Sequence, residues 1–567
     1  MSKYSIRENV TENDTGELKE YSELMQELLF HRGLKTAKQA EVFLNPDYDN
    51  HTHDPFLLKD MKKVVSRILN AIDEKQKIVI YSDYDCDGIP GGVILHDFFK
   101  KIGYKNFSNY IPHRHEEGYG LNADALEQFA KDKVRLVITV DCGISDASHI
   151  KRAKELGIDV IITDHHLPSG KLPQAYAILN PKQKSDKYPY KEISGANIAF
   201  KLVQALIKKG DFEIKEGWEK WLLDMAGLAT IADMVPLLDE NRVFAYYGMK
   251  VLRKSPRPGL MKLCRKMKID QRYLNEDDIG FMLVPRINAA SRMDVPDDAF
   301  ELLATEDEVE ADRLSAHLNK INNERKGIVA GIVKEIKKKI TKLDTLRSVI
   351  VMGDPRWKPA LLGLVANTVV DEYKRPVFLW GRDNGSNLKG SCRSDGSVNL
   401  VELMSSAGKT LIEYGGHVFS GGFSVSVENV HNLEDVLCGS YEKMKINNSE
   451  DIKEFIDKKL LIDDVNWDTY KIIEQLAPFG IGNPKPLFLF ENIEITEVRH
   501  FGREEGHLQL SFENSNGKKI NAIGFFVKSN SFGANLDKGR KINLIATMEK
   551  STFRNFPELR LRIVDVI

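Results

Sequence analysis

The stretch that decides the fold is KIVIYSDYDCDG, residues 77–88, in which an apolar run ends in three alternating carboxylates, Asp83, Asp85 and Asp87. Two more short apolar runs end in acidic residues: RLVITVDCG at 135–143 and DVIITDHH at 159–166. Short Val- and Ile-rich runs separated by helix-like sequence are typical of parallel strands buried on both faces. Because ligands bind beyond the carboxyl ends of such strands, we expect the acidic residues to converge on one crevice.

The predicted crevice holds a set of carboxylates and imidazoles: Asp83, Asp85, Asp87, Asp141, Asp164, His165 and His166. Crowded carboxylates raise each other's pKa unless a positive charge lies between them. An oxygen-rich site with little His or Cys suits Mg²⁺ or Mn²⁺, and His165 favours Mn²⁺. Acidic residues at strand ends also serve as helix N-caps, but three such motifs in one sheet favour a metal site.

Composition sets broad limits on the class of protein. The chain has 567 residues, of which 42% are hydrophobic and 29% are charged, so several globular domains are expected. Lys plus Arg number 81 and Asp plus Glu number 83, so any nucleic-acid site must be a local basic patch. The five cysteines form no CxxC pair, and the chain lacks both a signal-peptide core and a membrane-length apolar run. We expect a cytoplasmic protein without a membrane partner.

Alternating strand-like and helix-like segments predict a doubly wound parallel sheet in the first half of the chain. A proline-free helical stretch at 305–341 follows, with capping-box spacing between Thr305 and Glu308. At ~1.5 Å per residue it would span roughly 50 Å and bridge two domains, unless it packs along one domain only. A second α/β unit starts at SVIVMGD (348–354), and about five alternating strands after residue 488 suggest a small barrel.

These patterns predict five regions. They are an N-terminal helical extension (1–59), the α/β domain of the crevice (60–245), a helical region with the long connecting helix (246–345), a second α/β domain (346–445), and a helical connector with the barrel (446–567).

The motifs DYDCDG, VDCG, DHH and GLATIADMVPL (227–237) together resemble, in that order, the DHH phosphoesterase superfamily. Further stretches resemble its RecJ branch of single-stranded-DNA-specific exonucleases: HRHEEGYGLN (113–122), PRINAASRM (285–293), GGHVFSGGF (415–423) and PFGIGNP (478–484). The resemblance runs from about residue 25 to 567. It implies a DHH catalytic domain, a DHH-associated domain, a C-terminal oligonucleotide-binding (OB) fold, and metal-dependent 5′-to-3′ exonuclease activity on single-stranded DNA in repair and recombination.

Carried over by position, the resemblance implies that two divalent ions, Mn²⁺ or Mg²⁺, are held by Asp85, Asp87, Asp141, His165 and Asp233. Asp141 is the natural bridge between them. Asp83 and Asp164 are either ligands or residues that orient the ligands, and His166 is implied to contact the scissile phosphate. Two ions about 3.5 to 4 Å apart can activate a water and stabilise the leaving oxygen.

The resemblance also implies a pocket for a 5′-terminal phosphate, at Arg114, Arg292, Ser391 and Arg393. Guanidinium groups and hydroxyls suit that ligand. Glycine pairs flank His417 in the second α/β unit: Gly415 with Gly416, and Gly421 with Gly422. They either admit a sugar-phosphate chain or allow tight turns between strands; the resemblance favours the first reading.

Charges and rings in the predicted OB fold suit single-strand binding. The candidate DNA contacts are Arg499, Phe501, Arg503, Arg554 and Phe556, with His500, Arg560 and Arg562 as further candidates. Phe512 and Phe525 are expected in the core. Single-stranded DNA with a 5′ end is the implied partner, a single-strand-binding protein or a helicase is a candidate protein partner, and a monomer is expected.

The chain departs from the family pattern near the crevice, where Pro90, Gly91 and Gly92 replace small hydroxyl residues and Ser291 replaces glycine. Two other functions stay open. A phosphodiesterase for short oligonucleotides or cyclic dinucleotides would not need the barrel, and a non-catalytic scaffold would not need intact ligand positions.

Overall fold

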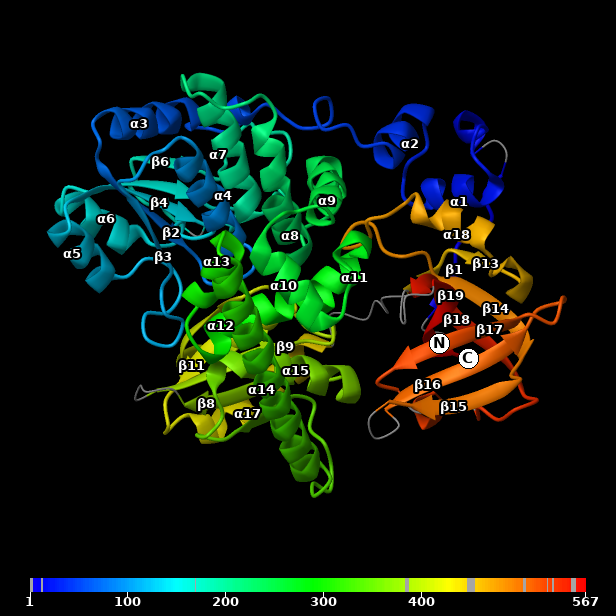
Figure 1. The fold of residues 1–567 in the computed structure, drawn as a ribbon. Helices are drawn as coiled ribbons and strands as arrows, with labels where there is room; N and C mark the ends of the chain where they lie inside the picture. The colour runs from blue at the N-terminus through cyan, green and yellow to red at the C-terminus, as the bar shows by residue number, and fades with distance from the viewer. Residues whose placement is uncertain are drawn as a thin grey trace.

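The computed structural model describes residues 4–11, 14–168, 170–382, 387–445, 454–502, 506–527, 529–532, 535–551 and 557–567. Figure 1 shows two α/β units stacked on one another and a strand-rich C-terminal domain beside them. The N-terminal helices α1 (Glu23–His31) and α2 (Ala37–Leu44) lie next to that C-terminal domain (Figure 1).

The first α/β unit is built on a five-stranded sheet in the order β3-β2-β4-β5-β6, with every neighbouring pair parallel. Its strands are β2 (Lys77–Ser82), β3 (Phe107–Tyr110), β4 (Val134–Val140), β5 (Asp159–Thr163) and β6 (Ala177–Leu179). Ile78 and Ile80 enter one hydrophobic core, whereas Val79 and Tyr81 enter another on the opposite face. A strand buried on both faces carries apolar residues without alternation. The predicted doubly wound parallel sheet is confirmed.

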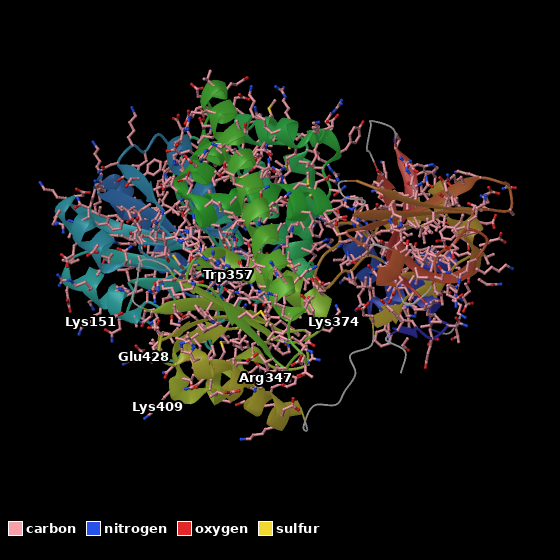
Figure 2. All side chains as sticks on the ribbon, turned by 90° about the horizontal axis from the view of Figure 1, so that it is seen from below. Lys151, Arg347, Trp357, Lys374, Lys409 and Glu428 are labelled. Carbon is pink, nitrogen blue, oxygen red and sulfur yellow. The ribbon has the colours of Figure 1, made fainter. Side chains whose placement is uncertain are left out.

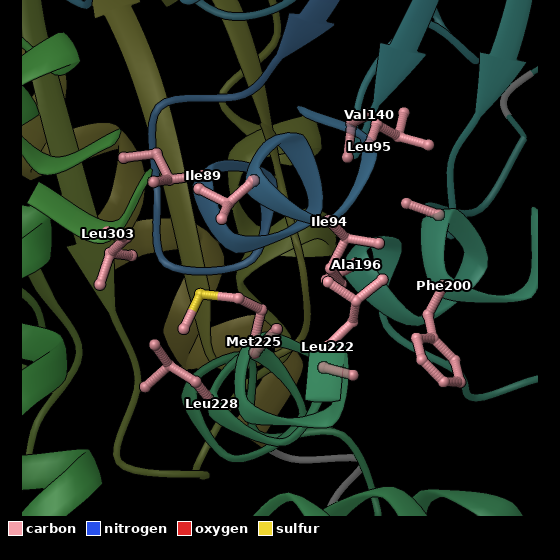
Figure 3. Packing of buried hydrophobic residues seen from close by; sticks show 14 of the residues in the cluster. Ile89, Ile94, Leu95, Val140, Ala196, Phe200, Leu222, Met225, Leu228 and Leu303 are labelled. Atoms are coloured by element: carbon pink, nitrogen blue, oxygen red, sulfur yellow. The ribbon is translucent and has the colours of Figure 1, made fainter. Parts of the chain in front are cut away.

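Helices cover both faces of this sheet. They are α3 (Met61–Asp73), α4 (Gly88–Lys101), α5 (Ala123–Lys131), α6 (Ala147–Glu155) and α7 (Gly195–Lys209). The core that contains Ile78 also takes residues from α3, α4 and α7, while α5 and α6 supply the other core. Figure 3 shows part of the first core, with Ile94 of α4, Ala196 of α7 and Met225 of α8 packed together.

A helical region follows the sheet. Its helices are α8 (Leu223–Ala232), α9 (Asp239–Leu252), α10 (Pro258–Met267), α11 (Glu276–Asp278), α12 (Val284–Met293), α13 (Asp297–Ala304) and α14 (Glu308–Ile340). A π-helical turn, Ile279–Leu283, leads into α12.

The long helix α14 bridges two cores. Leu314, Leu318 and Ile321 are buried in the core of the first unit, whereas Ile336 and Ile340 are buried in the core of the second. The prediction of a bridging helix is therefore confirmed, and packing along one domain is excluded. Its predicted start is wrong, because the Asp307 side chain caps the helix by accepting hydrogen bonds from the Val309 and Glu310 NH groups. A carboxylate at this end also favours the helix dipole.

The second α/β unit has a five-stranded mixed sheet in the order β10-β11-β9-β8-β7, in which only β7 and β8 pair in parallel. Its elements are β7 (Ile350–Gly353), α15 (Pro359–Tyr373), β8 (Val377–Arg382), β9 (Leu388–Arg393), α16 (Leu400–Ser406), β10 (Leu411–Gly416), β11 (Ser420–Val425) and α17 (Leu433–Lys445). Figure 2 views this unit from below, with Arg347, Trp357 and Lys374 labelled on it.

The C-terminal domain is a strongly paired sheet in the order β13-β14-β18-β19-β17-β16-β15. Its strands are β13 (Lys458–Lys459), β14 (Phe488–Glu494), β15 (Glu497–Phe501), β16 (His507–Glu513), β17 (Lys519–Phe525), β18 (Lys541–Ser551) and β19 (Glu558–Val566). Six strands follow residue 487, one more than expected from the sequence. Phe512 lies in the core with Phe488 and Phe490, as predicted.

The N-terminal segment joins this domain as well as the first unit. Strand β1 (Tyr4–Ile6) pairs in parallel with β12 (Glu454–Ile456), and α1 and α2 pack with residues around α18 (Trp467–Glu474).

Among the described residues, no helix is both long and apolar enough to cross a membrane.

Candidate metal centre and strand-binding surface

Three neighbouring strands deliver carboxylates to one edge of the first sheet. Asp83, Asp141 and Asp164 each follow the last residue of β2, β4 and β5. Their NH groups continue the ladder by donating to the Val140, Thr163 and Leu179 carbonyls at 3.0, 2.9 and 3.0 Å. The sheet therefore fixes the backbone of all three residues at the same edge.

The side chains of the crevice form three overlapping groups, in each of which the possible ligand atoms lie within 4.8 Å of one another. Asp83, Asp85 and Asp141 make one group, Asp87, His165 and Asp233 make a second, and Asp141, His165 and His166 make a third that joins the first two. Asp141 lies between them, since its Oδ1 is 3.2 Å from His165 Nε2. Asp233 reaches His165 Nε2 at 3.6 Å from the C-terminal end of α8. The structure thus brings together all five residues predicted as metal ligands.

The electrostatics of this crevice call for a cation. Burial, and then the charges of neighbouring carboxylates, raise the pKa of Asp141 and Asp233 well above the ordinary value. Burial and the charge of Asp85 raise the pKa of Asp87 to about 7. Asp141 Oδ1 accepts no hydrogen bond from the described residues. Buried carboxylate oxygens without donors are the atoms that a divalent ion would satisfy.

His165 is suited to bind a metal rather than a proton. Burial, together with the charge of His166, lowers the pKa of His165 to about 3. Its imidazole is therefore neutral near pH 7. Nε2 faces Asp87, Asp141 and Asp233 and has no hydrogen-bond partner among the described residues. A neutral nitrogen lone pair aimed at carboxylates is the form in which His ligates a metal.

The N-terminus of α7 holds Asp87 in place. The Gly195 and Ala196 NH groups donate to the two carboxylate oxygens of Asp87 at 2.6 and 2.8 Å. A Cβ at Gly195 would lie 2.6 Å from the Asp141 Cβ, so only glycine fits here. Sequence reasoning missed this contact; the signal was Ser194 as N-cap followed by glycine in SGAN, 194–197.

Glycines also let α4 approach the metal ligands. A Cβ at Gly88 would lie 2.5 Å from the Asp83 carbonyl oxygen, so only glycine lets the loop close this tightly. A Cβ at Gly91 would lie 2.5 Å from Val140 Cγ1, and one at Gly92 would lie 2.4 Å from Ser82 Oγ. The departures from the family pattern therefore allow the start of α4 to pack tightly on β2 and β4.

The geometry separates Asp164 from Asp83. Asp164 Oδ2 accepts from the Ile144 NH at 2.9 Å, and Oδ1 accepts from the His166 NH and lies 2.8 Å from His166 Nδ1. Burial would lower the pKa of His166, but the hydrogen bond and charge of Asp164 outweigh it and raise that pKa. Both oxygens of Asp164 are thus engaged, whereas Asp83 belongs to a ligand group.

Tyr119 was missed as a residue of this site. Its hydroxyl donates to the Asp141 carbonyl at 3.1 Å and lies 3.3 Å from His166 Nδ1. The signal was its position in HRHEEGYGLN (113–122), the motif from which only Arg114 was selected. Tyr119 therefore links the backbone of Asp141 to the half-exposed imidazole of His166.

Two of the predicted phosphate-pocket residues, Arg292 and Arg393, contact the first half of α15. Arg292 donates to the Ala360 carbonyl at 2.8 Å, and a Cβ at Gly363 would lie 2.7 Å from an Arg393 nitrogen. The Arg114 guanidinium lies 4.8 Å from the centre of the Tyr84 ring.

Arginine charges accumulate at this place. Burial, and the charges of Arg114, Arg325 and Arg393, lower the pKa of Arg292 to about 9. Arg325, on α14, was missed because a single arginine on a long helix gives no motif. Guanidinium groups whose charges together lower the pKa of Arg292 form a site for an anion.

The glycine pairs of the second unit lie beside the same pocket. On β11, Gly422 pairs with Ser391 of β9, and Gly421 pairs with Cys392. Gly415 and Gly416 of β10 pair with Gly422 and Gly421. The His417 NH donates to the Ser420 carbonyl at 2.7 Å, which closes the β10–β11 turn. The glycines therefore allow tight strand pairing and also leave the backbone next to Ser391 without side chains.

The C-terminal domain carries an aromatic and cationic surface. Arg499 is exposed on β15, and the Phe501 ring centre lies 5.2 Å from that of His507. The prediction that Phe525 is in the core is wrong: it is half-buried, with the Arg562 guanidinium 4.1 Å from its ring centre.

Other candidates on this surface have different outcomes. Arg560 and Arg562 both pair with Glu549, at 2.6 and 3.1 Å. Phe526, which sequence reasoning missed, is 89% exposed. Arg503, Arg554 and Phe556 lie outside the described residues.

Comparisons with known proteins agree with this architecture. Residues 77–231 match the model of the DHH family N-terminal domain, residues 346–442 match the DHHA1 domain, and residues 456–565 match the RecJ OB domain. The single-stranded-DNA-specific exonuclease RecJ of Haemophilus influenzae is 30% identical over 531 residues, which cover 91% of each chain. The chain belongs to the RecJ family.

Other RecJ proteins show the same relationship. The single-stranded-DNA-specific exonuclease RecJ of Bacillus subtilis is 36% identical over 544 residues, covering 96% of this chain and 67% of that protein. A crystal structure of RecJ from Thermus thermophilus in complex with Mn²⁺ superposes with a TM-score of 0.83 at 23% identity, covering 100% of this chain and 79% of that one. That superposition establishes a shared fold, including the C-terminal OB domain.

Proposed function

We propose that the protein is a metal-dependent exonuclease that hydrolyses the phosphodiester bonds of single-stranded DNA from its 5′ end. The observation that carries the proposal is the pair of buried ligand groups joined through Asp141. Membership of the RecJ family, whose curated members are named single-stranded-DNA-specific exonucleases, supports the substrate class.

We assign two divalent ions, Mn²⁺ or Mg²⁺, to the two ligand groups. Asp83, Asp85 and Asp141 would hold one ion; Asp87, His165 and Asp233 would hold the other, with Asp141 between them. When bound, such a pair supplies an activated water and stabilises the leaving oxygen of an in-line displacement. The donor set fits, because it is rich in oxygen and contains one buried, neutral imidazole.

His166 and Asp164 act on the phosphate rather than on the ions in this proposal. Asp164 fixes the His166 ring through Nδ1 and raises its pKa, so the imidazole is more readily protonated. When it is protonated, this half-exposed imidazole beside the ligand groups can donate to an oxygen of the scissile phosphate. Asp164 is thus assigned as a positioning residue, and Asp83 as a metal ligand.

The arginine pocket gives the reaction its direction. Arg114, Arg292 and Arg393, with Ser391, would hold a 5′-terminal phosphate, and the glycine-paired strands β10 and β11 would line its approach. The aromatic and cationic surface of the OB domain, with Arg499 and Phe501, would hold the strand farther along by charge and stacking.

The cellular setting is also part of the proposal. A 5′-directed nuclease for single strands fits repair and recombination, and a single-strand-binding protein or a helicase would supply its substrate. A monomeric state and a cytoplasmic location remain predictions from the sequence.

Two measurements test this function. A single strand of roughly 20 nucleotides labelled at either end, digested with Mn²⁺ or Mg²⁺, should release 5′-terminal nucleotides first; release from the 3′ end would contradict the assigned direction. Asp141→Ala should abolish cleavage and keep DNA binding, whereas Asp371→Ala, at an exposed position on α15, should cleave normally. Full activity of Asp141→Ala would refute the metal site.

A further inference from the structure

The PFGIGNP segment, 478–484, docks against the loop that carries the metal-site residue Asp233. The Leu237 NH donates to the Ile481 carbonyl at 2.7 Å. A Cβ at Gly480 would lie 2.8 Å from Leu237 Cδ1, and one at Gly482 would lie 3.1 Å from Leu238 Cδ1. The two loops therefore pack closely, and Gly482, with a φ of 77°, is also at a backbone conformation that favours glycine.

A buried asparagine makes the segment rigid. The Asn483 side chain is fully buried and donates to the Leu476 and Pro478 carbonyls at 2.8 and 2.9 Å. Its Oδ1 accepts from Arg32 Nε at 3.0 Å. The segment and the Asp233 loop thus form one well-fixed unit, and Figure 1 shows the segment passing beside α9 and α11 before it enters β14.

This rigid unit presents apolar side chains to solvent. Met234 is 66% exposed, Ile481 is 47% exposed and Leu238 is 40% exposed, whereas Val235 and Leu237 between them are buried. Met234 directly follows Asp233 and has a left-handed backbone, with φ of 58°. Single exposed apolar residues are common, but three held on two interlocked loops beside a catalytic crevice form a surface that suits a ligand.

The position of this surface indicates which ligand would bind there. It adjoins two other parts of the molecule along the chain: Met234 directly follows the metal-site residue Asp233, and residue 484 lies shortly before β14 (Phe488–Glu494) of the OB domain. A single strand that is cut at the metal centre and held by the OB domain would pass beside these side chains. Unpaired bases expose apolar faces that pack on such side chains, whereas bases in a duplex are already stacked on one another.

We infer that Met234, Leu238 and Ile481 form an apolar rim on which unpaired bases of the substrate strand pack as it passes between the metal centre and the OB domain. The inference rests on the proposed function and extends it, because it makes this junction a determinant of single-strand selectivity. The rim recognises bases and not phosphates, so it adds affinity without sequence preference.

Binding to a strand with and without bases tests the rim. Fluorescence anisotropy, without divalent ions so that no cleavage occurs, would measure the Kd of the full-length protein for a thymidine oligonucleotide and for an abasic strand with the same number of phosphates. Met234→Ser/Ile481→Ser should raise the Kd for the thymidine strand roughly tenfold and that for the abasic strand less than about twofold. Val309→Ser, at an 81%-exposed position in the first turn of α14, is the matched control and should change neither.

Each other outcome has a defined meaning. An unchanged Kd for the thymidine strand, or equal losses on both strands, overturns the inference; the first result assigns the rim to protein docking, and the second to general damage. The single variants Met234→Ser and Ile481→Ser should each show part of the base-dependent loss. If the wild-type protein neither binds nor cleaves the thymidine strand, the proposed function fails and the rim falls with it; wild-type cleavage with no effect of the variants refutes the rim alone.

Discussion

Adding one methyl group at Gly195 should disable the metal centre while leaving every proposed ligand in the sequence. In Gly195→Ala the new Cβ would lie 2.6 Å from the Asp141 Cβ and 2.8 Å from its Oδ1, where ordinary contacts begin at 3.4 Å. Asp141 or the start of α7 must therefore move by about 0.8 Å, the difference between 3.4 and 2.6 Å. The Gly195 NH also binds Asp87, so movement of α7 disturbs a second ligand.

The expected loss follows from this displacement. Misplacing catalytic groups by about 1 Å lowers rates roughly 100-fold, and disturbing the groups that orient metal ligands lowers metal affinity about 10- to 100-fold. We expect kcat/KM on a single strand to fall about 100-fold, and the Mn²⁺ concentration for half-maximal rate to rise. The stability cost of overpacking should be about 1–3 kcal/mol, which leaves the protein folded.

The control for this prediction is Gly439→Ala. Gly439 also lies in a helix, α17, and a Cβ there meets nothing within 4 Å. Its replacement should raise helix stability by about 0.5–1 kcal/mol and leave cleavage unchanged. Wild-type kcat/KM and Mn²⁺ dependence in Gly195→Ala would show that the crevice tolerates the displacement and would refute the argument.

Three further perturbations address other parts of the molecule. Asp164→Asn removes the charge that holds His166, so kcat should fall about 10- to 100-fold in initial-rate measurements, and an unchanged kcat would remove His166 from the reaction. Because the pKa of Asp87 is raised from 3.8 to about 7, the metal-free protein loses stability as pH rises between these values, and below about 7 a proton competes with Mn²⁺ for this carboxylate. The gain in melting temperature on adding Mn²⁺ should therefore be larger at about pH 8 than at about pH 6, and a gain independent of pH would contradict this assignment. Lys201→Met leaves Glu240 buried without the ammonium group that lies 2.8 Å away, which should lower the free energy of unfolding by about 3–5 kcal/mol and the melting temperature by roughly 10 °C in calorimetry. The double variant Lys201→Met/Glu240→Gln should recover most of this stability. Equal melting temperatures for the two variants would argue against an ion-pair effect.

The sequence predicted those parts of the site that depend on strand ends and on motif order. Asp83, Asp141 and Asp164 were placed correctly because a parallel sheet brings the ends of its strands to one edge. Asp233 was predicted only from the family resemblance. It lies at the C-terminal end of α8, and no sequence periodicity indicates that this helix end lies beside the ends of the strands. The choice between ligand and orienting residue for Asp83 and Asp164 depends on which NH groups point at each oxygen, and this follows only from three-dimensional structure.

Residues that act through backbone contacts leave only indirect signals in the sequence. Gly195 contributes an NH group and the absence of a Cβ, and only the preceding N-cap Ser194 pointed to it. Arg325 lies on a helix whose period predicts only which face is buried. The start of α14 was misplaced because Thr305 and Asp307 both precede an acidic first turn, and only the observed hydrogen bonds identify Asp307 as the cap.

The long helix α14 also sets the distance between the two halves of the proposed active site. Its first half is fixed in the core of the domain that carries the metal ligands, and its second half is fixed in the core of the domain that carries Ser391 and Arg393. One added residue between these anchors would lengthen the helix by about 1.5 Å and turn one domain by roughly 100° against the other. If Ser391 and Arg393 hold the end of the strand as proposed, the distance from that end to the bond that is cut, and with it the size of the released product, would depend on the number of residues between the two buried stretches of α14.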